Sequence, residues 1–263
     1  MVVLDGGTGA ERRQLAQIGV GVGVGSSTAT VSADHRVVLT SWTSREPGCF
    51  FHVGVAPFDG SGTLVEWGRG INPSFSPDGR LVAWREASDG DCAQQALVVR
   101  DVTSGVEQRI VLTVAGQGFV TTGGPWWRDN DTIVFQDIGQ DAARAGGLLE
   151  FDLRTAHTRA DGRPVVVPCL GDVSEMGSAW QVPGRADPIT SRPAGGGATT
   201  LTVCPLDGST PRPIATVSAS PVYLFADTSE GSALVVDTTG TLSIASASNE
   251  LRRVAANVQA AAW

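Results

Sequence analysis

The sequence predicts an all-β fold: a six-bladed β-propeller built of four-stranded blades. Glycine supplies 33 of the 263 residues and proline another 14, a composition that disfavours long helices and favours short strands with tight turns. Two kinds of hairpin alternate along the chain. The second kind occurs six times, and dividing 263 residues among six copies gives about 44 residues for each unit, which is the length of one four-stranded blade.

The first kind of hairpin is clearest in Asn72–Trp84. Within it, Pro77-Asp78-Gly79 is a strong turn signal, because proline presets φ and glycine accepts a positive φ. Leu81–Trp84 then reads as a short apolar strand. We expect these hairpins to supply the two inner strands of each blade. Related segments occur, in chain order, at Thr30–Leu39, Pro125–Phe135, Gly177–Trp180, Ser220–Tyr223 and Val258–Trp263.

The second kind of hairpin ends in a polar turn and is clearest in Leu97–Glu107. Met1–Glu11 aligns with it without a gap. We expect these hairpins to supply the two outer strands of each blade. The remaining copies are Val55–Ser61, Leu148–Thr155, Val203–Ser209 and Thr241–Ser246.

The two ends of the chain predict a shared sixth blade within a single propeller domain spanning residues 1–263. The chain begins inside a second-kind hairpin and ends after one entering strand. We therefore expect residues 1–18 and 257–263 to lie in one blade, with one inner and two outer strands. The missing strand would follow Trp263, so we expect the native gene to continue past this residue. Such an incomplete blade should be the least stable.

The charges of the chain exclude several functions. There are 27 acidic and 19 basic residues, for a net charge of −8, whereas a nucleic-acid-binding protein normally carries a basic face. We therefore expect no nucleic-acid partner. All basic residues are arginine, which excludes a Schiff-base lysine and a Walker-A lysine. No stretch is long and apolar enough to predict membrane insertion.

The four cysteines favour disulfides and an oxidising compartment, because they are even in number, widely spaced and form no C-x-x-C pair. Four unpaired thiols are the alternative. Cys49 and Cys92 each follow the tryptophan of an inner hairpin by seven or eight residues, so we expect a bridge between loops of successive blades. Cys169 and Cys204 are then the second pair, although their predicted positions, before an inner strand and near the end of an outer one, are not obviously close.

The residues and repeats described so far resemble the TolB-type, WD-repeat-like six-bladed propeller. The resemblance rests on Ser-Pro-Asp-Gly-Arg at residues 76–80, on the Asp-x-x-x-Gly turn of the second hairpin and on the six-fold count. It covers essentially the whole chain, but only Phe75–Trp84 matches closely, and the Gly-His and Trp-Asp dipeptides of the eukaryotic WD family are absent. In the TolB-type family the fold mostly serves as a binding platform, or as a domain attached to a peptidase or receptor. The resemblance therefore implies a binding role.

Catalytic and metal-binding patterns are weak in this sequence. His35, His52 and His157 fall in different structural positions of different blades, so we do not expect them to converge on a metal. A G-x-S-x-G nucleophile elbow is absent. The pairs Asp89/Asp91 and Asp129/Asp131 lack the ordered ligands of a calcium loop. We therefore expect no metal, no cofactor and no catalytic residue in this chain.

The tryptophans occupy mostly equivalent positions in the repeats, so we expect them to pack between blades. The alternative is an exposed aromatic patch, and it is considered for the pair Trp126-Trp127. Adjacent strand residues point to opposite faces of a sheet, so we do not expect both side chains to be buried in the same way. This pair is therefore the best candidate for an exposed aromatic patch that binds a partner.

The function most consistent with these patterns is a non-catalytic binding module, the extracytoplasmic part of a larger bacterial protein. It would be periplasmic, secreted or on the cell surface, with a protein, small-molecule or glycan ligand. The alternatives are a peptidase or other hydrolase with its catalytic domain outside this chain, an unrecognised lyase site, and the sensor domain of a membrane receptor. We expect binding at the loops around the channel mouth. The polar residues predicted there are Arg45, Glu46, Arg69, Arg85, Asp89, Asp91, Asp137, Asp141, Arg144, Asp172 and Glu175.

Overall fold

The computed structural model describes most of the strands and many of the turns between them. The described residues are 2–4, 11–14, 28–32, 34, 36–43, 51–87, 95–114, 121–137, 147–167, 169, 178–181, 187–217, 221–227, 232–237, 241–245 and 251–255. In this part of the chain the regular elements are strands. No helix there is long and apolar enough to cross a membrane.

The strands form five sheets of four or five strands and one two-stranded sheet. In each larger sheet, four strands follow one another in chain order, and we call these sheets the first to fifth blades. The first blade contains β3 (Thr28–Val31), β4 (Val37–Thr43), β5 (Phe51–Pro57) and β6 (Val65–Arg69). The second contains β7 (Ile71–Phe75), β8 (Leu81–Ala87), β9 (Gln95–Asp101) and β10 (Glu107–Thr113). The third contains β11 (Thr121–Trp127), β12 (Thr132–Asp137), β13 (Gly147–Asp152) and β15 (Arg163–Val165).

The remaining strands form the fourth and fifth blades and an N-terminal hairpin. The fourth blade contains β16 (Ser178–Gln181), β17 (Pro188–Gly195), β18 (Ala198–Val203) and β19 (Arg212–Val217). The fifth contains β20 (Pro221–Asp227), β21 (Ser232–Asp237), β22 (Leu242–Ala245) and β23 (Leu251–Ala255). The hairpin pairs β1 (Val2–Leu4) with β2 (Glu11–Gln14), and β14 (Arg159–Asp161) is an additional strand of the second blade.

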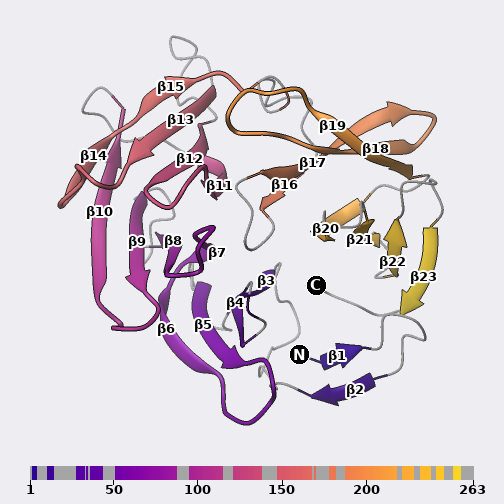
Figure 1. The fold of residues 1–263 in the computed structure, drawn as a ribbon, viewed down its shortest axis with the longest axis horizontal. Helices are drawn as coiled ribbons and strands as arrows, with labels where there is room; N and C mark the ends of the chain where they lie inside the picture. Colours follow the sequence, from indigo (N-terminus) through magenta and orange to yellow (C-terminus); the bar gives the residue numbers. More distant parts are fainter. Residues whose placement is uncertain are drawn as a thin grey trace.

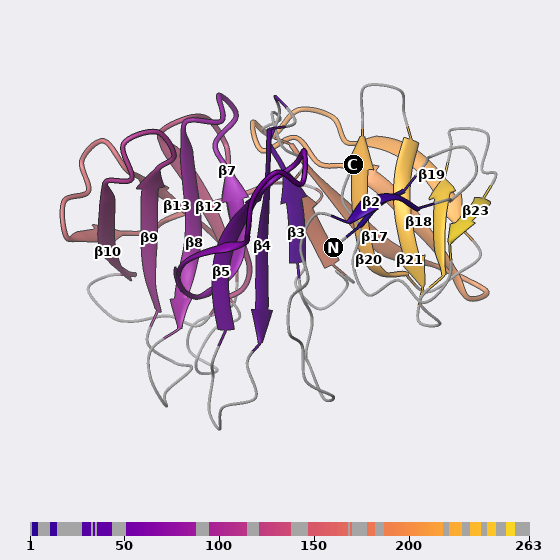
Figure 2. The ribbon, with the colours of Figure 1, turned by 90° about the horizontal axis from the view of Figure 1, so that it is seen from below.

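The blades stand around a central axis (Figure 1). Their first strands follow one another around it, because β3 contacts β7, β7 contacts β11, β11 contacts β16 and β16 contacts β20. In Figure 1 the β1–β2 hairpin lies between the fifth and first blades, and Figure 2 shows β4, β5, β8, β9 and β10 standing along the short axis. The all-β propeller prediction is confirmed. The count of six stays a prediction, because residues 257–263, expected to form an inner strand, lie outside the described residues.

The turns of the inner hairpins repeat the same hydrogen bonds, as the sequence pattern predicts. In the first blade the Ser32 hydroxyl donates to Asp34 Oδ1 at 2.7 Å, and in the second Ser76 donates to Asp78 Oδ1 at 2.7 Å. The same two serine hydroxyls accept hydrogen bonds from backbone N–H groups of the following strands. A carboxylate that binds its own turn in this way stabilises the turn without a partner from another blade.

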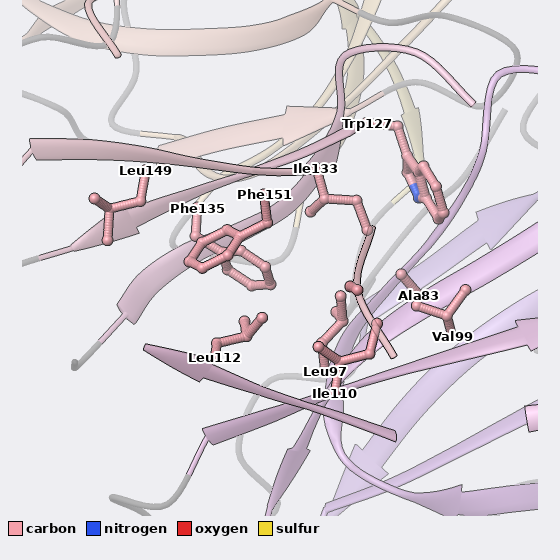
Figure 3. Packing of buried hydrophobic residues seen from close by; sticks show 11 residues of the cluster. Ala83, Leu97, Val99, Ile110, Leu112, Trp127, Ile133, Phe135, Leu149 and Phe151 are labelled. Carbon is pink, nitrogen blue, oxygen red and sulfur yellow. The ribbon is translucent and has the colours of Figure 1, made fainter. Parts of the chain in front are cut away.

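The core lies between neighbouring blades, as Figure 3 shows for the second and third. Trp127 is fully buried there, and its indole N–H donates to the Ser74 carbonyl of β7 at 3.2 Å. Side chains of β12 and β13 fill the same space from the third blade. Those labelled in Figure 3 from the second blade are Ala83, Leu97, Val99, Ile110 and Leu112. Interdigitation of apolar side chains across this interface provides the main stabilisation.

The prediction of an exposed patch at Trp126 and Trp127 is wrong, because the two side chains are only 3% and 0% exposed. They do point to opposite faces of the third blade. Trp127 packs against the second blade, and Trp126 packs in a cluster with Cys169 and Cys204 on the other side. A propeller blade is covered on both faces by its neighbours, so adjacent residues can both be buried. Interblade packing is also seen for Trp84, which is 2% exposed and donates its indole N–H to the Arg69 carbonyl of the first blade. It stays a prediction for Trp180 and Trp263.

The outer edge of the third blade contains an arrangement that the repeat does not predict. Residues 159–165 divide between two sheets: β14 pairs in parallel with β10 of the second blade, and β15 pairs antiparallel with β13 of the third. Gly162 lies at the division, and its N–H donates to the Thr113 carbonyl at 2.7 Å. We call residues 159–165 the crossing strand. It hydrogen-bonds two neighbouring blades to each other at their rim.

The predicted bridge between Cys169 and Cys204 is present. Its Cα atoms are 5.6 Å apart, within the distance that a disulfide spans. Cys169 follows the third blade, Cys204 follows β18 of the fourth, and both are buried. The bridge therefore links two successive blades. Cys49 and Cys92, the other predicted pair, lie outside the described residues.

Candidate functional site

Three of the polar residues predicted for the channel mouth are described by the structure. Arg69 ends β6 and directly precedes Gly70, and Arg85 lies in β8. The backbones approach so closely here that a Cβ built on Gly70 would lie 2.4 Å from the Arg85 carbonyl oxygen. Burial lowers the pKa of Arg85 to about 10, because a charged group is less stable away from water. Asp137 ends β12.

The remaining residues of that predicted surface are not tested. They lie outside the described residues, so the binding surface at the channel mouth stays a prediction. These residues are Arg45, Glu46, Asp89, Asp91, Asp141, Arg144, Asp172 and Glu175.

A polar pocket lies on the third blade. It has a volume of about 520 Å³. It lies where the hairpin turns of the third blade meet the crossing strand. Four arginines line it: Arg128, Arg154, Arg159 and Arg163. Four carboxylates line it as well: Asp129, Glu150, Asp152 and Asp161.

Glu150 is the most buried of the charged residues that line this pocket. It lies in β13, and its side chain is only 5% exposed. One carboxylate oxygen accepts a hydrogen bond from Arg128, which follows β11, and the other accepts one from Arg163 in β15. Burying a carboxylate is costly unless cations and hydrogen bonds compensate for the lost water. The two arginines provide this compensation and are in turn held in place by Glu150.

The other carboxylates of the pocket accept hydrogen bonds from the chain itself. Asp152 binds Arg154 through two guanidinium nitrogens, at 3.0 and 2.8 Å. The Arg154 hydrogen bond holds the pKa of Asp152 below its usual value, and the same contact raises the pKa of Arg154. Asp129 accepts the N–H of Asp131 at 2.8 Å, and Asp161 accepts the Thr113 hydroxyl at 2.9 Å.

Sequence reasoning missed this pocket. It considered Asp129 and Asp131 only as a metal-ligand candidate, and its simpler interpretation of them as a hairpin turn agrees with the Asp129 hydrogen bond. A signal was present in the mixture of acidic and basic residues along 150–163. That mixture alone does not show that Arg128, 22 residues before Glu150 in the sequence, binds the same carboxylate.

The histidines that the structure describes lie on outer strands and turns. His52 lies in β5, its Nδ1 atom is hydrogen-bonded to the Glu66 carboxylate at 2.8 Å, and its ring stacks on Trp42. The backbone carbonyl of His157 accepts a hydrogen bond from the Gln108 amide. His35 lies outside the described residues. Among the residues that are described, no three His, Cys, Asp or Glu side chains are grouped as metal ligands.

Sequence comparison and structure comparison give different results. No protein-family model matches the sequence, and no curated protein matches it. Among solved structures, TolB from Acinetobacter baumannii is similar at a TM-score of 0.54 and 12% identity, over 88% of this chain and 53% of TolB. An oligogalacturonate lyase in complex with manganese also has a TM-score of 0.54, at 13% identity, over 97% of this chain and 84% of the lyase.

The tricorn protease is a third similar structure, at a TM-score of 0.51 and 9% identity, over 90% of this chain and 27% of the protease. This chain thus spans about half the length of TolB and about a quarter of the tricorn protease. At these identities the likeness establishes the fold. The protein is a β-propeller, and its fold is that of the TolB-type propellers that its sequence resembles.

Proposed function

We propose that this propeller is a non-catalytic binding module and part of a larger protein. The observation that carries the proposal is the open polar pocket of the third blade, in which a buried carboxylate holds two arginines, Arg128 directly after β11 and Arg163 in β15. Side chains that are held by hydrogen bonds have little freedom, and preorganised polar groups lose less entropy when a ligand binds. The fold also supports the proposal. The similar structures include TolB, and the TolB-type fold, which the sequence resembles, mostly serves as a binding platform.

We propose an extracytoplasmic location for this module. The support is the disulfide between Cys169 and Cys204, which is buried between two blades. Disulfides that stabilise structure persist in oxidising compartments and are rare in the cytosol. The net charge of −8 makes nucleic acid an unsuitable partner.

Ligand-detected NMR with the purified chain tests the binding proposal. The chain is mixed in turn with libraries of sugars, sugar acids, amino acids and short peptides, and each mixture is examined again after prolonged incubation. We expect saturable binding by at least one chemical class, with every ligand recovered unchanged. Conversion of a bound ligand into product would contradict the non-catalytic role. Absence of binding across all classes would contradict the binding role of the isolated chain.

A lyase is the second candidate function. It is favoured by the structural similarity to an oligogalacturonate lyase, of whose length this chain covers 84%. That likeness shows that a chain of similar extent and fold acts as an enzyme. The test is incubation of this chain with oligogalacturonate, with and without manganese. Elimination produces a conjugated unsaturated uronide that absorbs ultraviolet light, so its appearance would establish the lyase and its absence would favour the binding module.

A further inference from the structure

We propose that the pocket of the third blade binds the carboxylate group of a small polar molecule. This inference rests on the proposed binding function and adds the chemical class of the ligand and the residues that hold it. The ligand carboxylate would be bound by the guanidinium groups of Arg128 and Arg163, which Glu150 fixes in position.

The first argument is the number of hydrogen-bond donors. A guanidinium group has five N–H donors arranged as a planar fork, which matches the two oxygens of a carboxylate. In this structure Arg128 and Arg163 each direct one terminal nitrogen to Glu150. The rest of each fork is available to a ligand in the cavity that both residues line. The Arg163 side chain is 74% exposed, so a ligand can reach it without rearrangement.

The second argument is that the acidic residues of the pocket already have donors. Asp152 is bound by Arg154, Asp129 by a backbone N–H, and Asp161 by the Thr113 hydroxyl. Their negative charges are therefore partly satisfied within the protein. A ligand that brings acceptor oxygens complements the arginines better than a ligand that brings further donors.

The third argument concerns the rest of the ligand. Four arginines and four carboxylates line the pocket, so its formal charge is balanced. A balanced pocket does not attract polyanions from a distance, and it favours a molecule with a single carboxylate recognised at short range. The other described lining residues are Thr132, Thr155, Ala156 and Ala160. They are small or polar, which suits hydroxyl or amide groups next to the carboxylate. The volume of about 520 Å³ is that of a small-molecule site.

Isothermal titration calorimetry with matched probes tests the inference. The probes are glucuronate, lactate and N-acetylglycine, each with one carboxylate and each at constant ionic strength, and glucose is the neutral counterpart of glucuronate. We expect saturable binding of at least one carboxylate, and no binding of glucose. We expect Arg163→Gln to weaken that binding by about tenfold or more, because a charge-assisted hydrogen bond is lost. Arg163→Lys keeps the charge without the fork and should give an intermediate affinity.

Arg253→Gln, an exposed position in β23 of the fifth blade, is the matched control and should bind like the parent chain. Circular dichroism of each variant verifies that the fold is retained. Failure of all three carboxylates to bind would overturn the inference, as would equal binding of glucose or an affinity unchanged by Arg163→Gln. If the carboxylate inference fails but the NMR libraries reveal a ligand of another chemical class, the proposed binding function is retained. The failure of the inference can thus be distinguished from the failure of the proposed function.

Discussion

At the scale of single residues, the aspartates of the hairpin turns act as local hydrogen-bond acceptors. Asp101 Oδ1 accepts the backbone N–H groups of Thr103 and Ser104, at 3.0 and 2.8 Å, and also the Ser104 hydroxyl. These hydrogen bonds, with those from Ser104 first, lower the pKa of Asp101. Contacts with Ser32 and with Ser209 lower the pKa of Asp34 and of Asp207 in the same way. The occurrence of Asp close to Ser in these turns therefore has a physical cause.

Asp101→Asn tests this role through its pH dependence. A carboxyl whose pKa is lowered by folding stabilises the fold at pH values above its unfolded pKa, and this stabilisation is lost as the pH falls through the folded pKa. We expect Asp101→Asn to lower the free energy of unfolding at neutral pH, and the difference from the parent chain to shrink between roughly pH 5 and pH 2. Urea denaturation at several pH values measures it. Asp131→Asn, at another exposed turn, is the control, and an equal change there would contradict the assignment.

At the scale of elements, the crossing strand and the three residues before it join two blades through hydrogen bonds. Val111 of β10 donates to the Thr158 carbonyl at 2.9 Å, and Gly162 donates to Thr113 at 2.7 Å. The Gln108 amide also donates to the carbonyls of Ala156 and His157. These contacts cover the outer edge of the second blade, which would otherwise present unpaired backbone groups to solvent. The same segment carries Arg163, so the strand that joins the blades also builds the pocket.

Gly162→Ala should disturb this element. A Cβ at this position would lie 2.7 Å from Cζ of the buried Phe151 ring and 3.3 Å from Leu149 Cβ. We expect a loss of about 1–3 kcal/mol of stability, as for other overpacked positions. We also expect faster hydrogen exchange at the Val111 amide, measured by NMR. Gly147→Ala, where nothing lies within 4 Å of the added Cβ, is the control. A stable Gly162→Ala chain with unchanged exchange would contradict this account.

At the scale of the whole molecule, successive blades are held together by apolar packing, hydrogen bonds and one described covalent link. Trp84 and Trp127 each donate an indole hydrogen bond to a backbone carbonyl of the preceding blade, of Arg69 and of Ser74. The disulfide then joins the segment after the third blade to the end of β18 in the fourth. Because each blade contacts its neighbours, loosening one interface exposes apolar surface on two sheets.

Removing the disulfide measures the contribution of the covalent link. Cys169 and Cys204 are 35 residues apart, and closing a loop of this length stabilises a fold by roughly 3–4 kcal/mol. We expect the Cys169→Ala/Cys204→Ala chain to lose about this amount in urea denaturation, with Cys49 and Cys92 left in place. Each single variant should lose nearly as much as the double variant, because either one breaks the bridge. A loss in the double variant near the sum of two large single losses would show that packing, not the link, is responsible.

The alternation of two hairpin types was sufficient to predict strand order and turn chemistry, because hairpins are formed by residues close in sequence. Ser76-Pro77-Asp78-Gly79 specifies its own turn, and the Ser32–Asp34 turn of the first blade repeats the same serine-to-aspartate bond. The pairing of Cys169 with Cys204 could be proposed only by elimination, and their approach to 5.6 Å between Cα atoms came from the docking of two blades.

Only the tertiary structure decided which side chains meet between and beside the blades. Cover on both faces of the third blade buries Trp126 together with Trp127, although alternation along a strand suggested that one would be exposed. The pocket likewise depends on lateral strand pairing, which places Arg128 and Arg163 on the two oxygens of Glu150. Such contacts are set by the register between strands and by the packing of separate blades, and a single sequence carries no spacing signal for either.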